Sequence, residues 1–204
     1  MTHHSHQRCL LIGTANPGKL HEISILLGAI PWELRSLRDF ENVIEPEENG
    51  TSYIENAVTK AQHYAVATGL ITLADDSGLE VNALDRAPGL FSARYAGEHA
   101  SDEDRRSRLL SELTGSSKRD RIARFVCAVA IASPDRKVLH STEGICNGSI
   151  ALVPRGHSGF GYDPLFIPEG YEQTFAELAE AVKNQISHRA RALMKTRDFL
   201  VRNI

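Results

Sequence analysis

The sequence lacks the features that mark membrane, secreted and disulfide-stabilised proteins. No apolar run among its 204 residues reaches the roughly 18 residues that a membrane-spanning helix needs. The first residues contain no apolar core of the kind found in signal peptides. The three cysteines, Cys9, Cys127 and Cys146, lie far apart and form no Cys-x-x-Cys pair, which indicates reduced and mostly buried thiols. These absences predict a cytoplasmic protein with no membrane partner.

The chain also has no excess of positive charge. It contains 23 Lys and Arg residues against 26 Asp and Glu residues, and its formal net charge is −3. Because proteins that bind a nucleic-acid backbone usually carry a basic stripe, a nucleic-acid-binding module is the least favoured class and no nucleic-acid partner is expected. A small, strongly anionic ligand would have to be met by a local cluster of Lys and Arg.

The composition is that of a globular protein. Hydrophobic residues make up 42% of the chain and charged residues 24%, which is near the average for globular domains. The chain shows no internal repeat and no long linker. We therefore predict one domain over residues 1–204, in which residues 1–7, with His3, His4 and His6, form a flexible leader or tag remnant.

The order of apolar runs and helix signals predicts an α/β fold. An apolar run at residues 9–12 is followed by a loop and by a helix that begins near Lys19 and ends at Gly28. Ser52 and Glu55 have capping-box spacing and open a helix that ends near Gly69. Further predicted elements are strands at residues 32–37 and 70–74, a helix capped by Ser101, antiparallel strands at 124–132 and 137–146, and a last helix from about Ser187. Thr174 and Glu177 repeat the capping-box spacing.

Two adjacent carboxylates, Asp75 and Asp76, follow the apolar run at residues 70–73. The pattern predicts a strand that ends at the edge of a sheet, where Gly78 lets the backbone turn away. Adjacent carboxylates repel each other and are tolerated mainly when a cation or a proton lies between them. The alternative interpretation is a solvated turn, because Asp, Ser and Gly are ordinary turn residues.

The first loop, residues 13–19, fits the pattern G-x-x-x-x-G-K between a strand and a helix. Leu20 follows, however, where a P-loop needs Ser or Thr to bind magnesium. The N-terminus of the helix offers free N–H groups, and Lys19 adds a full positive charge. We interpret the segment as a phosphate-binding loop without its own metal ligand, the alternative being a strand-to-helix turn with a solvated lysine.

Carboxylates from other segments would then have to hold the metal ion. Candidates are Asp75, Asp76, Glu47 and Glu48, since magnesium prefers hard oxygen ligands and usually takes one or two carboxylates together with substrate phosphates. Glu47 and Glu48 considered alone are also typical of a solvated acidic loop.

A glycine-rich segment at residues 159–164 places two aromatic rings, Phe160 and Tyr162, next to Asp163. Glycines permit close approach of the backbone, the rings offer stacking surfaces, and the carboxylate can accept hydrogen bonds from ring N–H groups. The segment therefore suits a nucleobase, although a tight turn that fills the core with aromatic rings is the alternative.

Basic residues stand at the predicted start of the last helix. With Ser187 as the N-cap, His188 and Arg189 fall in the first turn, and Lys183 lies just before it. Positive charge at a helix N-terminus opposes the helix dipole. Residues that weaken a helix in this way without a structural benefit are typical of a ligand-binding site.

Taken together, these segments resemble the inosine triphosphate pyrophosphatase family, the pyrophosphatases of non-standard purine nucleoside triphosphates. The chain departs from the family pattern at Ala190, where the family often has Gly after the His-Arg pair, and Pro17 stiffens the first loop. The matching blocks occur in family order and are residues 14–19 with Glu22, 47–50, 54–57, 74–79, 87–89, 92–95, 159–164 and 186–189.

The resemblance implies hydrolysis of ITP, dITP and XTP to the monophosphate and pyrophosphate, with Mg²⁺, in a homodimer. It also implies an elongated α/β fold with a mixed central sheet flanked by helices and two lobes around a nucleotide-binding cleft. Asp76 would be the catalytic carboxylate and, with Glu47, would bind magnesium. Substrate would be bound by Thr14, Ala15, Asn16, Pro17, Gly18, Lys19, Ser77, Phe160, Gly161, Tyr162, Asp163, Lys183, His188 and Arg189.

The base selectivity of such an enzyme has a physical explanation. Hypoxanthine and xanthine present a 6-oxo acceptor and an N1–H donor, whereas adenine presents a 6-amino donor and a bare N1. A buried donor such as Arg189 facing position 6 would be left unpaired by adenine, at a cost of about 1–3 kcal/mol or more. Alternatives to this function are a Maf-like pyrophosphatase that acts on pyrimidine or modified nucleotides, and a nucleotide-binding regulator without catalysis.

Overall fold

The fold is built on one six-stranded mixed sheet. The computed structural model describes residues 8–115 and 117–203, so the predicted leader at residues 1–7 lies outside the described residues. The strands follow the order β2-β1-β3-β4-β5-β6, in which β1 pairs in parallel with β2 and β3 and the remaining pairs are antiparallel. The strands are β1 (Arg8–Ile12), β2 (Trp32–Ser36), β3 (Ile71–Val81), β4 (Ile122–Ala132), β5 (Val138–Ile150) and β6 (Phe166–Pro168).

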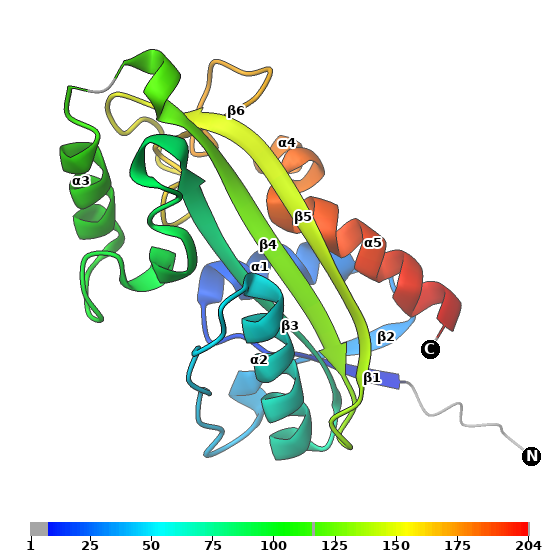
Figure 1. Cartoon of the computed structure of the whole chain (residues 1–204). Coiled ribbons are helices and arrows are strands. Elements are labelled where there is room, and N and C mark those ends of the chain that lie inside the picture. Colours follow the sequence, from blue (N-terminus) through cyan, green and yellow to red (C-terminus); the bar gives the residue numbers. More distant parts are fainter. Residues whose placement is uncertain (1–7, 116, 204) are drawn as a thin grey trace, which may run out of the picture.

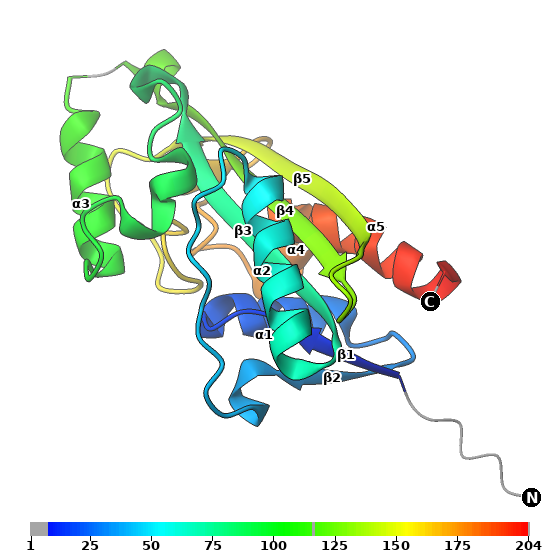
Figure 2. The same ribbon diagram turned by 60° about the horizontal axis from the view of Figure 1, so that its bottom comes forward.

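Helices cover both faces of this sheet. Helices α1 and α5 lie on one face and α2 on the other, while α3 stands at the far end of the molecule (Figures 1 and 2). The predicted α/β fold with a mixed central sheet flanked by helices is thus confirmed. The helices are α1 (Pro17–Leu27), α2 (Tyr53–Thr68), α3 (Asp102–Glu112), α4 (Glu180–Ile186) and α5 (His188–Asn203), and short 3₁₀ turns occupy Leu37–Asp39, Asn82–Leu84, Gly89–Arg94 and Lys118–Arg121.

Alternate side chains of strand β4 point to opposite faces of the sheet and belong to two different apolar clusters. Cys127, Val129 and Ile131 belong to the cluster that includes residues of α1 and α5, whereas Ala128 and Ala130 belong to the cluster under α2. Because both the strand and α2 present alanines to each other, the helix packs close to the sheet. A third cluster, which includes Leu79, Leu109, Phe125, Phe166 and Phe175, forms the core at the α3 end.

Strand β3 does not end where the sequence predicted. It runs for 11 residues through Asp75, Asp76 and Gly78, so the predicted turn at this point is wrong. The physical reason is long-range, because β4 pairs with β3 along its length, from Thr72 to Val81. Gly78 serves close packing instead of a turn, since an added Cβ would lie 2.3 Å from the carbonyl oxygen of Gly89.

Local signals placed most helix ends correctly. Ser52 and Ser101 accept hydrogen bonds from the N3 amides of α2 and α3, and Ser187 Oγ accepts from the amide of Ala190 in the first turn of α5. The capping pattern at Thr174 does not open a helix, and the next helix, α4, begins at Glu180. None of the helices in residues 8–115 and 117–203 is long and apolar enough to cross a membrane.

The topology leaves an opening beside the middle of β3. Strand β1 ends at Ile12 and pairs with β3 only as far as Leu73, whereas β3 continues past Asp75 and Asp76. The loop after β1 and the N-terminus of α1 fill the space that a longer β1 would take. The carboxyl end of a parallel strand next to a helix N-terminus is the usual place for a ligand in an α/β sheet.

Candidate functional site

One pocket lies at this opening and collects residues from segments far apart in the chain. Its volume is about 130 Å³, less than the roughly 300–1,000 Å³ typical of small-molecule sites, so a whole nucleotide triphosphate would extend beyond it. The predicted site residues that line it are Asn16, Lys19, Asp76, Ser77, Phe160, Gly161, Tyr162, Asp163, Lys183, His188 and Arg189. The predicted residues that do not line it are Thr14, Ala15, Pro17, Gly18 and Glu47.

The first loop is organised by its own side chains. Asn16 Oδ1 accepts from the backbone N–H of Lys19 at 3.1 Å and thereby caps α1, and Thr14 Oγ1 accepts from the N–H of Asn16 at 3.2 Å. Pro17, at the first helical position, has no N–H to offer. Fewer free amides are therefore available to an anion than the sequence suggested, and Lys19 carries the positive charge of this wall.

The two aspartates point to opposite faces of the sheet. Asp75 Oδ2 lies 3.2 Å from Nζ of Lys19, and Asp76 bonds instead to Asn56 and Lys60 on α2. Successive residues of a strand alternate between faces, so the two carboxylates are kept apart and the cation predicted to lie between them is not needed. Burial alone would raise the pKa of Asp75, but the nearby Lys19 and Arg189 outweigh it and hold the pKa below its ordinary value.

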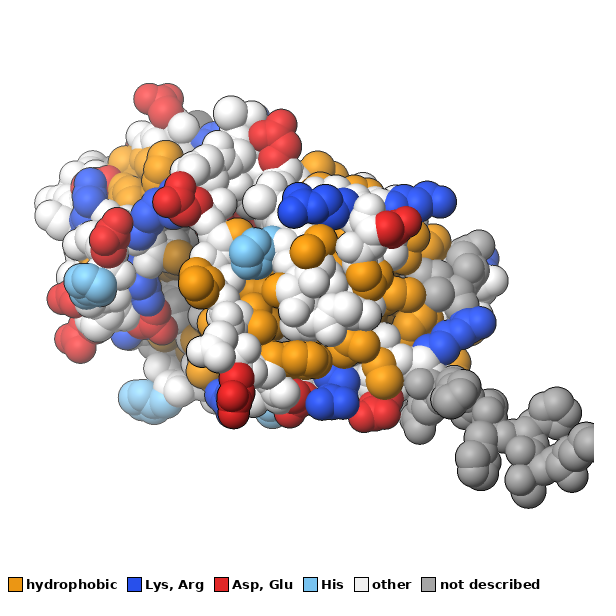
Figure 3. All heavy atoms as spheres, turned by 90° about the horizontal axis from the view of Figure 1, so that it is seen from below, with side chains coloured by type: hydrophobic (Ala, Val, Ile, Leu, Met, Phe, Trp, Pro, Cys, Tyr) orange, Lys and Arg blue, Asp and Glu red, His pale blue; other side chains and the backbone are white. Residues whose placement is uncertain are grey.

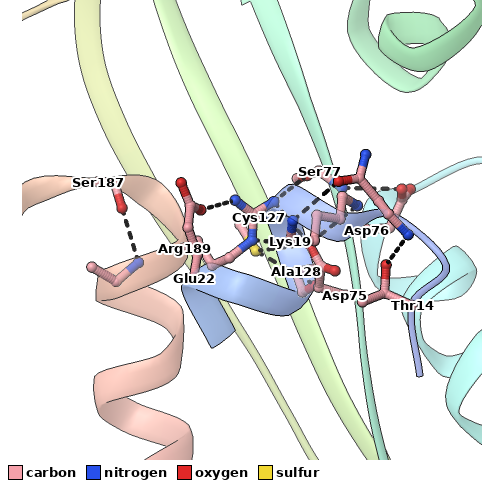
Figure 4. Close-up of polar contacts among 12 residues, drawn as sticks. Thr14, Lys19, Glu22, Asp75, Asp76, Ser77, Cys127, Ala128, Ser187 and Arg189 are labelled. Carbon is pink, nitrogen blue, oxygen red and sulfur yellow. Dashed lines mark hydrogen bonds and ion pairs between the residues drawn. The ribbon is translucent and has the colours of Figure 1, made fainter. Parts of the chain in front are cut away.

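A buried network of charges links the first loop to the last helix. Arg189, only 1% exposed, donates from its guanidinium to Asp75, Glu22 and Ser77 (Figure 4). Lys183 bonds Glu22 at 2.7 Å and also contacts Asp163. Burial lowers the pKa of Lys183, yet Asp163 and Glu22 raise it above its ordinary value, so the amine is charged.

This network is balanced in charge. The three cations Lys19, Lys183 and Arg189 face the three carboxylates Glu22, Asp75 and Asp163. Buried ion pairs are tolerated when every charge has a partner. Arg189 therefore holds α1, β3 and α5 together, and its contact with the purine 6-oxo group stays a prediction.

Aromatic rings line the other wall of the pocket. The ring of His188 stacks on Phe125 with centroids 4.5 Å apart and an angle of 11° between the planes. The ring of Phe160 lies 5.1 Å from Nζ of Lys183 and packs so close to Gly18 that an added Cβ there would lie 2.5 Å from it. A flat ligand could therefore be bounded by apolar rings here.

The imidazole of His188 has an unused polar atom. Its Nδ1 is buried and has no hydrogen-bond partner within the described part of the chain. Burial, together with Arg189 and Lys183, lowers the pKa of His188 well below its ordinary value, so the ring is neutral near pH 7. A buried polar atom without a partner is costly unless a ligand satisfies it.

The loop before α2, residues 40–52, is rich in glutamate and is called the acidic loop here; it contributes Glu48 to the pocket. Glu48 Oε1 lies 2.7 Å from Nζ of Lys60, which also lies 3.4 Å from Oδ1 of Asp76. Glu47 is exposed and accepts a hydrogen bond from Asn49. The structure thus places Glu48, and not the predicted Glu47, beside Asp76.

Asp76 and Glu48 are the residues of this pocket that could hold a divalent cation, provided that substrate oxygens complete its coordination. No group of three or more His, Cys, Asp or Glu in residues 8–115 and 117–203 is arranged to hold a metal by itself. Magnesium commonly uses one or two carboxylates, together with water and phosphate oxygens. The shared contact with Lys60 shows that the two carboxylates border the same space.

Several residues of the site were not predicted from the sequence. Asn56 and Lys60 lie one helical turn apart on the buried face of α2, among alanines. Polar residues at this spacing on an otherwise apolar helix face were the available signal. Asp102 and Arg105, at the start of α3, also line the pocket, and only the tertiary structure brings them there.

Comparisons with known proteins agree with this site. The Ham1 family model matches residues 10–199. A dITP/XTP pyrophosphatase of Geobacter sulfurreducens is 48% identical over 191 residues, which cover 94% of this chain and 96% of that protein. One of Bacillus subtilis is 44% identical over 190 residues, with 93% and 96% covered. The structure of a HAM1 protein from Coxiella burnetii matches with a TM-score of 0.85 at 40% identity and covers 95% of this chain and 98% of that one. The resemblance identified from the motifs is confirmed, and the chain belongs to the Ham1 family.

Proposed function

We propose that this protein hydrolyses non-standard purine nucleoside triphosphates, namely ITP, dITP and XTP, to the monophosphate and pyrophosphate. The single observation that supports this most is the pocket itself, which joins Lys19 and Asp76 to the rings of Phe160 and His188. Such a pocket can receive a polyphosphate at one end and a base at the other. The relatives named above as dITP/XTP pyrophosphatases support the same substrate class.

The residues of the phosphate end have separate tasks in this proposal. Lys19 and the N-terminus of α1 bind the phosphate tail and offset its charge. Asp76 orients a water molecule for in-line attack on the α-phosphorus and accepts its proton. Pyrophosphate then leaves while Lys19 holds it.

Mg²⁺ is the cofactor that we propose for this site. Asp76 and Glu48 are the side chains that would hold it, and the predicted role of Glu47 stays open to test. When bound, the ion would neutralise charge on the phosphates and make the attacking water more acidic. Lys60 keeps the two carboxylates together by pairing with both.

A pair of matched variants separates the two glutamates. We expect Glu48→Gln to lower kcat about 10–100-fold and to raise the Mg²⁺ concentration needed for half-maximal rate, the loss typical of a weakened metal site. Glu47→Gln removes the same charge from the neighbouring residue and should leave both values near those of the wild type, because its side chain is exposed. A magnesium titration of ITP hydrolysis measures this, and the reverse order would restore Glu47 as the ligand.

The base end of the pocket would discriminate against adenine. The pocket wall offers the cationic donors Lys183 and Arg189, and His188 is neutral. A 6-oxo group can accept hydrogen bonds from such donors, whereas the 6-amino group of adenine is itself a donor and cannot pair with them. Lys183 and Arg189 keep their carboxylate partners, so only their remaining N–H groups would lose a partner to adenine. Each unpaired buried group costs about 1–3 kcal/mol, so two of them would lower kcat/KM for ATP by about 30-fold or more.

The substrate panel that tests this function compares ITP, XTP, dITP, GTP and ATP with and without Mg²⁺. We expect the monophosphate and pyrophosphate from the first three, with kcat/KM at least about 30 times that for ATP. Equal kcat/KM for all five nucleotides would contradict the proposal. Hydrolysis of pyrimidine or modified nucleotides alone would favour the Maf-like alternative, and binding without pyrophosphate release would favour a regulator.

We also propose that the enzyme is a cytoplasmic homodimer, as the resemblance implies. Figure 3 shows apolar side chains gathered on one face of the molecule, a surface of the kind that a second copy could cover. Among the described residues, the exposed apolar side chains include Ile25 on α1 and Met194 on α5, which share one face of the sheet, and Val66 on α2, on the opposite face.

A further inference from the structure

Asn56 lies behind the pocket and is bonded at both ends of its side chain. It is 2% exposed and is not among the residues that line the pocket. Nδ2 donates to Oδ2 of Asp76 at 3.0 Å, and Oδ1 accepts from the backbone N–H of Gly50 at 2.8 Å. An N–H can only donate and a carboxylate can only accept, so these partners also determine which end of the amide is oxygen.

The orientation of Asp76 depends on this bond. Its Oδ1 accepts from the N–H of Ser77 at 3.0 Å and lies 3.4 Å from Nζ of Lys60. Asn56 donates to the other oxygen. A carboxylate that is held at both oxygens cannot rotate freely, so removal of the amide would let Asp76 turn away from the attacking water.

The position of the acidic loop depends on the same amide. Gly50 passes so close that an added Cβ would lie 2.5 Å from Oδ1 of Asn56. Lys60 pairs with Glu48, and Nε2 of His63 lies 2.8 Å from the carbonyl oxygen of Ile44. Residues 56, 60 and 63 lie on one face of α2, which therefore holds the loop along the helix.

We propose that Asn56 is a positioning residue for nucleotide hydrolysis, whose carboxamide sets Glu48 relative to Asp76 without touching the substrate. The inference rests on the proposed function, in which these two carboxylates bind Mg²⁺ and Asp76 orients the water. Lys60 links the same groups through its charge, whereas Asn56 links them through directional bonds. Loss of Asn56 therefore changes the geometry of the site and leaves its charge unchanged.

Two substitutions separate the two bonds. Asn56→Leu has similar size and removes both, whereas Asn56→Asp keeps an acceptor for Gly50 and loses the donor to Asp76. We expect Asn56→Leu to lower kcat for ITP about 10–100-fold with little change in KM, because Lys19 and the aromatic wall remain in place. Asn56→Asp should lose at least as much kcat, since it sets a second carboxylate against Asp76.

Amide hydrogen exchange supplies a readout that does not depend on turnover. We expect the Gly50 amide to exchange faster in Asn56→Leu and to keep its protection in Asn56→Asp. Gln62→Leu is the matched control, because that carboxamide lies on the same helix and donates to the carbonyl of Arg136, outside the pocket. The control should change neither kcat nor the exchange of Gly50.

The possible results distinguish this inference from the proposed function. If the wild type hydrolyses ITP and both Asn56 variants keep wild-type kcat, the positioning role is wrong. If Gln62→Leu loses as much kcat as Asn56→Leu, the effect is a general one of α2 and the role is also wrong. If the wild type releases no pyrophosphate, the proposed function fails, and unchanged exchange of Gly50 in Asn56→Leu would additionally overturn the anchoring of the loop. Should the leucine variant not fold, wild-type kcat in Asn56→Asp would still show that the positioning role is wrong.

Discussion

Replacement of Asp76 by asparagine is expected to lower kcat for ITP about 10³-fold or more, because an amide neither accepts a proton from water nor binds Mg²⁺ well. The fold should remain intact. Lys60 faces both Asp76 and Glu48, so the loss of one carboxylate leaves a neutral pair instead of an unpaired buried charge. Pyrophosphate release and the thermal midpoint Tm, measured on the same preparation, check both expectations.

The control for this variant is the same chemical change at a distance. Asp135→Asn alters an exposed turn carboxylate that bonds Ser133, and it should leave kcat near the wild-type value. Near-normal turnover in Asp76→Asn would remove Asp76 from the centre of the mechanism. A large fall in Tm would show instead that the residue is mainly structural.

The neighbouring substitution, Asp75→Asn, is expected to show the opposite pattern in stability. Asp75 is 1% exposed and pairs with Lys19 and Arg189 at 3.2 Å and 3.1 Å. Because the surrounding network is balanced, removal of this carboxylate leaves an excess positive charge in the interior. Breaking a buried pair in this way costs about 3–5 kcal/mol, which corresponds to a fall in Tm of roughly 10 °C for a chain of this size.

Thermal unfolding of the wild type and the two variants side by side measures this difference. The two positions are adjacent and chemically identical, so each serves as the control for the other. Equal Tm values for Asp75→Asn and Asp76→Asn would contradict the assignment of one aspartate to the buried network and the other to catalysis.

Helix boundaries could be predicted from the sequence because their signals are local. Ser52, Ser101 and Ser187 each bond to an amide three residues later, and Gly69 takes the left-handed conformation that ends α2. These contacts need only neighbours along the chain, so the residue pattern is sufficient to locate them.

The course of β3 could not be predicted from its own residues. Asp, Ser and Gly favour a turn, but β4 begins 41 residues beyond the end of β3 and its pairing keeps the strand extended. Lys19, Lys60 and Arg189 supply the charges that make the aspartates tolerable, and they come from three different helices. Only the tertiary structure brings these partners together.

Distance along the chain also decides which residues of the site could be predicted. Lys19, Asp76 and His188 could be identified from short motifs that carry their chemistry within a few residues. Glu48 could not be preferred over Glu47, because the choice depends on Lys60 of α2. Asn56 stands out as a polar residue on an apolar helix face, but its role could not be predicted, since it depends on contacts with Gly50 and Asp76 that only the folded chain forms.

A structure of the protein with Mg²⁺ and a non-hydrolysable ITP analogue would show whether Lys19, Asp76 and Glu48 bind the triphosphate and its metal ion. We expect phosphate oxygens within hydrogen-bond distance of Lys19, a magnesium ion bound by Asp76 and Glu48, and the base between the rings of Phe160 and His188. A triphosphate that lies away from Lys19, or a metal ion that contacts neither Asp76 nor Glu48, would contradict it.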